Sequence, residues 1–143
     1  MSKNFGRNIA YLGLDAAATA TGSTGNVSGT IYDLQGYTGV VFICPIGATA
    51  TNNFLVAKGG SATASMSDIA GSVCTGHTTM LMLELHQPHT GRYVQPQLRL
   101  GTSAHYGPIL AFGLGAENLP VTNSSLLTYK FVNHPVSGTA TSS

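Results

Sequence analysis

Few residues of this chain have the types and spacing that catalysis or metal binding needs. Glu84 and His86 are the strongest candidates. They stand two apart in a segment of alternating polarity, so both side chains share one strand face, as in an acid–base couple or half of a metal site. His86 and His89 flank a turn that contains Pro88 and could share a metal ion. Exposed strand faces often carry such pairs, so we expect no catalytic residue, no cofactor and no metal site.

The wider search for catalytic patterns gives the same expectation. The acidic residues are far apart in the sequence, and the chain has no nucleophile elbow, phosphate-binding loop or zinc-protease motif. Cys44 and Cys74 lack metal-binding spacing, and we expect two buried free thiols. We therefore expect that the chain is not an enzyme. A small binding or hydrolytic domain that uses Glu84 and His86 is the less favoured alternative.

The composition points to assembly with other subunits. Only 8% of the residues are Asp, Glu, Lys or Arg, against about 25% in an ordinary soluble domain. A surface with so little charge repels its neighbours weakly and loses its water cheaply. The six basic residues are scattered and the net charge is +1, so we expect no nucleic-acid partner. No apolar run suits a membrane span or a signal peptide, so we expect synthesis in a cytoplasm and no membrane partner.

Short apolar runs bounded by Gly, Pro, Asn or Ser recur along the chain. They predict a single all-β domain over residues 1–143, an antiparallel β-sandwich or jelly-roll-like barrel. The clearest run, 79–87, puts three leucines on one face and two methionines, Glu84 and His86 on the other. A turn then leads to residues 92–100, which we expect to be its hairpin partner.

Other segments give further strands. Pro96 cannot donate a ladder hydrogen bond, which predicts that its strand is an edge strand or carries a bulge. Residues 66–71 indicate one helical turn with Ser67 as a possible cap. Residues 15–27 are rich in Ala, Thr, Gly and Ser, and residues 133–143 contain Pro and small polar residues, so both are predicted to be flexible or arm-like. Residues 1–8 are expected to be flexible or arm-like as well. Further strands are expected at 53–58, 106–114 and 126–132. Residues 30–34 and 39–46 are expected to pair with each other. The run 39–46 is apolar on both faces, which predicts a central strand or one that a partner subunit covers.

Four short motifs, in one order, resemble a pattern found in small virion proteins of tailed bacteriophages. Residues 33–43, Asp-Leu-Gln-Gly-Tyr-Thr-Gly-Val-Val-Phe-Ile, are similar to a D-x-Q-G-[FY]-x-G-V segment that leads into an apolar strand. Residues 67–72 resemble the family's D-[LI]-A-G-S turn. Residues 87–94 resemble its K-P-x-x-R-Y-V turn and strand, with Gln87 in place of the lysine and one extra residue before the arginine. Residues 134–140 are similar to its S-P-x-x-G-T-A tail.

This resemblance covers roughly residues 31–140 and carries the functional expectation. It implies a structural virion protein, a capsid decoration or cement protein that binds the outer surface of a phage head and stabilises capsomer contacts. The implied location is the capsid surface. The implied partners are the major capsid protein and copies of the chain itself, with a homotrimer favoured. A neck, tail or fibre component of the virion is the alternative.

The expected contact elements are the two Gly- and Thr-rich tails at 15–27 and 133–143, the turn 87–92 and the polar face of the strand 92–100. Arg92 and Arg99 are the expected anchors, because a guanidinium fork tolerates burial at an interface better than an ammonium group. The candidate capsid or subunit interface consists of Arg92, Tyr93, Gln95, Gln97 and Arg99.

Overall fold

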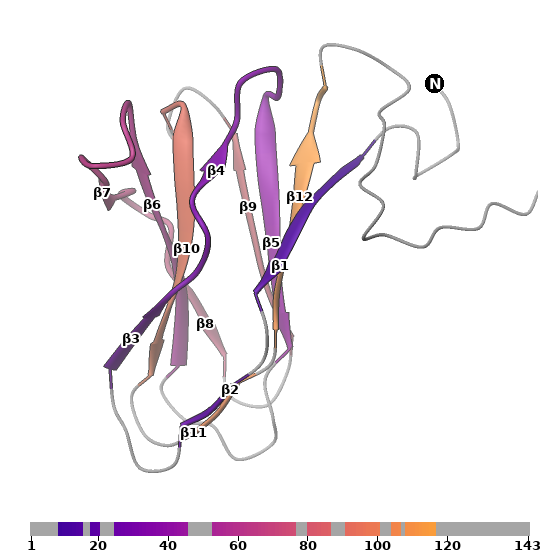
Figure 1. The fold of residues 1–143 in the computed structure, drawn as a ribbon. Coiled ribbons are helices and arrows are strands. Elements are labelled where there is room, and N and C mark those ends of the chain that lie inside the picture. The colour runs from indigo at the N-terminus through magenta and orange to yellow at the C-terminus, as the bar shows by residue number, and fades with distance from the viewer. Residues whose placement is uncertain are drawn as a thin grey trace, which may run out of the picture.

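The computed structural model describes residues 9–15, 18–20, 25–45, 53–76, 80–86, 91–100, 104–106 and 108–116. These residues form antiparallel strands in two sheets that pack together, and they contain no helix (Figure 1). The all-β sandwich that the sequence predicts is therefore confirmed. Within the described ranges, no helix is long and apolar enough to cross a membrane.

The four-stranded sheet has the strand order β1-β12-β5-β9. Its strands are β1 (Ala10–Asp15), β5 (Gly39–Pro45), β9 (Met80–His86) and β12 (Ile109–Leu114). β5 pairs with β12 on one side and with β9 on the other. Its apolar run on both faces predicts this central position, which is confirmed.

The six-stranded sheet has the order β3-β10-β6-β7, with β4 also paired to β10 and β8 also paired to β6. A separate two-stranded ladder joins β2 and β11. The strands predicted at 53–58 and 92–100 are β6 and β10. The bounds are β3 (Gly25–Ser28), β4 (Tyr32–Asp33), β6 (Asn53–Gly60), β7 (Ser67–Asp68), β8 (Cys74–Gly76), β10 (Tyr93–Leu100), β2 (Ala18–Ala20) and β11 (Ala104–Tyr106).

Alternate residues of both sheets point into one apolar core. In β9, Leu81 and Leu83 are buried while Met80 and Met82 are exposed, as the period of two predicts. Apolar burial, at about 25 cal/mol per Å², is the main force that holds the two sheets together. The buried core comprises Tyr32, Leu34, Val40, Phe42, Cys44, Leu55, Ala57, Leu81, Leu83, Val94, Leu98, Ile109 and Ala111.

The two hairpins expected from the sequence are wrong. β9 pairs with β5 in the four-stranded sheet, whereas β10 pairs with β6 in the six-stranded sheet. Likewise, β4 pairs with β10 and not with β5. β9 and β10 each bury one face, and in a sandwich two such strands can face each other across the core as well as lie side by side.

Pro96 does not lie in an edge strand, because β10 has partners on both sides. In an extended strand the N and C=O of one residue point to the same side. The carbonyl oxygen of Pro96 accepts from the Gly29 N–H at 2.8 Å, so its ring nitrogen also faces Gly29, between β3 and β4. The side-chain amide of Gln95 donates to the Gly29 carbonyl at 2.8 Å and thereby replaces the missing N–H.

The helical turn expected at 66–71 is also wrong. Ser67 and Asp68 form β7, which pairs with β6, and Gly71 has a positive φ of 80° that a right-handed helix does not contain. The Ser72 hydroxyl holds the turn, since it donates to the Ile69 carbonyl at 2.7 Å and accepts from the Ala57 N–H at 3.1 Å.

Two other segments differ from the expectation. The run 106–114 divides into the end of β11 and β12, and the inward residues of β12 include the small Ala111 and Gly113. Residues 18–20 and 25–27, expected to be arm-like, lie in β2 and β3, where ladder hydrogen bonds order a Gly- and Thr-rich sequence. The strand expected at 126–132 and the arms expected at 1–8 and 133–143 fall outside the described residues.

Candidate interaction surface

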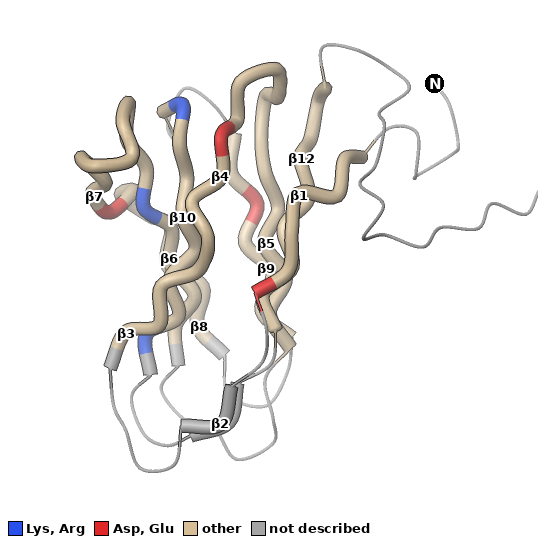
Figure 2. The backbone as a smooth tube through the Cα atoms, viewed as in Figure 1, with Lys and Arg blue, Asp and Glu red and all other residues tan. Residues whose placement is uncertain are grey.

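The outward face of β10 carries four of the five candidate interface residues. Because side chains alternate along a strand, Tyr93, Gln95, Gln97 and Arg99 point away from the core, while Val94 and Leu98 are buried in it. Figure 2 shows that charged positions are sparse, and most of those on the described chain lie in or next to the six-stranded sheet.

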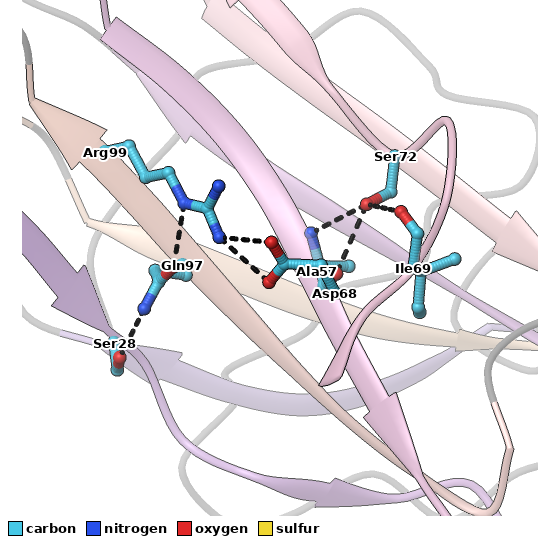
Figure 3. Close-up of polar contacts among 7 residues, drawn as sticks. All are labelled: Ser28, Ala57, Asp68, Ile69, Ser72, Gln97 and Arg99. Carbon is cyan, nitrogen blue, oxygen red and sulfur yellow. Dashed lines mark hydrogen bonds and ion pairs between the residues drawn. The ribbon is translucent and has the colours of Figure 1, made fainter. Parts of the chain in front are cut away.

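Gln97 is the centre of a hydrogen-bonded network on this face (Figure 3). Its side-chain amide donates to the Ser28 hydroxyl on β3 at 3.0 Å. Its carbonyl oxygen accepts from Nε of Arg99 at 2.9 Å. Gln97 is only 4% exposed although it points outward. A buried amide is tolerated when both of its ends are hydrogen-bonded, and these two bonds satisfy both ends of the Gln97 side chain.

Arg99 extends the network across the sheet. One guanidinium nitrogen donates to both carboxylate oxygens of Asp68, each at 2.8 Å. Asp68 belongs to β7 and Arg99 to β10, and β6 lies between these strands, so the ion pair crosses β6. Val56 of β6 stands opposite Gln97 on this outward face and is only 3% exposed. The polar network therefore covers an apolar residue of the outer face.

Arg92 takes part in a second, separate ion pair. Its Nε and one terminal nitrogen donate to the two oxygens of Asp33 at 3.0 and 2.8 Å, a bidentate geometry. The guanidinium carbon lies 5.1 Å from the centroid of the Tyr93 ring. Arg92 precedes β10 and stands seven residues before Arg99, about 23 Å away at ~3.3 Å per residue. The two expected anchors thus lie at opposite ends of β10.

Both ion pairs shift the titration of their carboxylates. The hydrogen bond from Arg92 holds the pKa of Asp33 below its usual value, and the hydrogen bond from Arg99 does the same for the pKa of Asp68. The Asp33 hydrogen bond in turn raises the pKa of Arg92. Both arginines use guanidinium donors for bonds within the chain.

Glu84 and His86 lie on the other sheet, as a pair. Nε2 of His86 is 2.7 Å from Oε1 of Glu84, and both side chains are exposed. Among the described residues, no three His, Cys, Asp or Glu side chains come together in a way that could hold a metal ion. His89 falls outside those residues. Cys44 and Cys74 are free thiols, as expected, although Cys74 is only partly buried.

The sequence analysis missed the partners of the two arginines. Asp33 and Asp68 each belong to one of the motifs that resemble phage virion proteins, and Arg92 belongs to a third. In the structure, Asp33 pairs with Arg92, and Asp68 pairs with Arg99. The motifs give no signal of which charged residues pair, because the pairing depends on the order of the strands in the sheet.

Comparisons of this chain with protein-family models, with curated protein sequences and with solved structures find no match.

Proposed function

We propose that this chain is a structural virion protein, a capsid decoration or cement protein that binds the outer surface of a phage head and stabilises capsomer contacts. The resemblance of its four motifs to small virion proteins of tailed bacteriophages supports this role. Its proposed partners are the major capsid protein and copies of the chain itself.

The observation that carries the proposal is that every carboxylate of the described residues is hydrogen-bonded within the chain. Asp33 pairs with Arg92, and Asp68 pairs with Arg99. Glu84 is hydrogen-bonded to His86. The remaining described carboxylate, Asp15, accepts from the backbone N–H of Thr30 at 3.0 Å and from its hydroxyl at 2.7 Å. A surface of this kind can be buried against a neighbour without stranding an unpaired carboxylate.

The outward face of β10 is our proposed contact with the capsid. Gln95 and Gln97 are held by hydrogen bonds to β3 and to the residue that follows it, and Arg99 is held by Asp68. Side chains that are already ordered lose less conformational entropy when a partner binds. A modest contact of this kind gains strength through repetition around a symmetric shell.

Binding to phage heads that were assembled without this chain tests the proposal. We expect the purified chain to saturate such heads at a fixed ratio to the major capsid protein. The double variant Arg92→Ala/Arg99→Ala should clearly lower the occupancy of the heads and should change the thermal stability of the chain much less. The matched control, Asp33→Ala/Asp68→Ala, breaks the same two ion pairs but keeps both arginines, so it should retain more binding than the arginine variant.

Two outcomes would contradict parts of this proposal. Heads that do not bind the chain at any concentration would contradict the capsid role itself. Equal occupancy by the arginine variant and the wild-type chain would contradict the assignment of Arg92 and Arg99 as anchors.

A further inference from the structure

The outer face of the four-stranded sheet is a continuous apolar surface. The ladder registers place Met82 opposite Ile43, and Ile43 opposite Leu110. In the same way they place Phe112 between Val41 and Tyr11, whose ring meets the Phe112 ring edge-on at 5.9 Å. Residues directly opposite one another in a ladder share a face. The apolar side chains of this surface are Tyr11, Leu14, Val41, Ile43, Pro45, Met80, Met82, Leu110, Phe112 and Leu114.

The most exposed large apolar side chains of the described residues concentrate on this surface. Met80 is 60% exposed, Met82 59% and Leu14 53%, and only one other large apolar residue, Val73 at 60%, is comparably exposed. Single exposed apolar residues are ordinary on protein surfaces, whereas a contiguous group marks an interaction site. Methionine adapts its shape to a partner, which suits it to such a site.

Charge is nearly absent from the same surface. Among the described Asp, Glu, Lys and Arg residues, only Glu84 lies on it. Glu84 belongs to β9, an edge strand of this sheet, where it stands opposite Val41 and is hydrogen-bonded to His86. Asp15 of β1 instead bonds Thr30, which follows a strand of the other sheet. Two copies of this surface can therefore meet without opposing like charges at their centre.

We propose that this apolar face is a self-association surface, on which a second copy of the chain packs. The proposed function already includes copies of the chain as partners, and this inference assigns the surface at which those copies meet; its test is independent of capsid binding. It also gives the two sheets different binding roles. The apolar face of the four-stranded sheet binds another copy, while the polar face of β10 remains free for a different partner. The polar network of Ser28, Gln97, Arg99 and Asp68 lies wholly on the opposite sheet.

The size of the face predicts how strong the association is. Four strands at ~4.8 Å spacing and about six residues at ~3.4 Å give a planar area of about 400 Å² per copy. A standard interface takes about 800 Å² from each partner, and smaller ones belong to weak or transient complexes. We therefore expect a concentration-dependent oligomer rather than a permanent one, in which high local concentration on an assembly favours the contact.

Sedimentation equilibrium of the full chain over a wide concentration range tests this inference. We expect the apparent mass of the wild type to rise with concentration. The variant Met80→Lys/Met82→Lys should stay monomeric, and both positions are exposed in the monomer, so it should still fold. The control, Val73→Lys, adds a charge at an equally exposed residue outside the face and should associate like the wild type.

Methionine oxidation supplies a second readout on the same samples. Met80 and Met82 should become protected from peroxide as the concentration rises, because the second copy covers them. A trimer that the methionine variant dissociates would also support the face as the self-association surface. A wild type that is monomeric at every concentration, or an oligomer that the methionine substitutions leave intact, would overturn the inference. Protection in a monomer would instead assign the face to another segment of the same chain.

Discussion

The hydroxyl of Ser72 closes a gap in the six-stranded sheet, and its removal should be costly. β7 pairs with Lys58 and Gly59 of β6, and β8 pairs with residues 53–55, so neither strand pairs with Ala57. Ala57 is fully buried, and its N–H donates to the Ser72 hydroxyl at 3.1 Å. Its carbonyl accepts from the Ile69 N–H at 3.0 Å. Ser72, itself only 3% exposed, therefore acts as the missing strand partner of the Ala57 N–H.

The substitution Ser72→Ala leaves that buried N–H without an acceptor. Stranding a buried donor costs about 1–3 kcal/mol. The hydroxyl also donates to the Ile69 carbonyl at 2.7 Å, and the loss of this partly buried bond adds about 0.5–1 kcal/mol. The Ala57 carbonyl keeps its bond from Ile69. We therefore expect the free energy of unfolding to fall by about 2–3 kcal/mol.

Urea denaturation of the wild type and the variant measures this change. The control is Ser61→Ala, which removes an exposed hydroxyl beyond the end of β6 and should alter stability by less than about 0.5 kcal/mol. Hydrogen exchange of the Ala57 amide should accelerate in the Ser72 variant. If Ser72→Ala costs no more than the Ser61 control, the hydroxyl does not act as a strand partner and the reasoning is refuted.

Three other predictions follow from single contacts. Gln95→Ala removes the donor that replaces the missing proline N–H, so it should lower the free energy of unfolding by about 1 kcal/mol in urea denaturation. Burial raises the pKa of Cys44 to about 11, so mass spectrometry of the native chain at pH 8 should find Cys74 alkylated long before Cys44; equal rates would contradict the burial. The folded-state pKa values of Asp33 and Asp68 are lowered, so their stabilisation is present above the unfolded pKa of about 3.9 and is lost as the pH falls through the lower folded values. The difference in thermal stability between the wild type and Asp33→Asn/Asp68→Asn should therefore shrink as the pH falls below about 4, and a constant difference would contradict the ion pairs.

Periodicity predicts the strands β5, β6, β9, β10 and β12, but it misses β1, β2, β3, β7 and β8 and predicts strand neighbours poorly. The alternation in β9 gives both its extent and its buried face, because one face must meet the core. It does not tell whether β10 lies beside β9 or across from it, since both arrangements bury the same leucines. In β12 the larger side chains face outward, because Gly113 lies against the Tyr37 ring, where a Cβ atom would come within 2.8 Å.

The candidate surface shows the same limit. The polar face of β10 follows from the alternation of its residues. Its network does not, because Asp68 and Arg99 are 31 residues apart and meet only through the strand order β10-β6-β7. The apolar outer face likewise depends on the placement of β5 between β12 and β9. Contacts of this kind require the topology, which the spacing of residues within one strand does not contain.

The most direct test of the central claim is the number of copies of this chain in a purified virion, measured by quantitative mass spectrometry against the major capsid protein. A decoration or cement role predicts a ratio near one or a simple fraction of it, because the chain then repeats with the shell. A few copies per particle would contradict that role and favour a neck, tail or fibre component. A particle without this chain would contradict the virion role altogether.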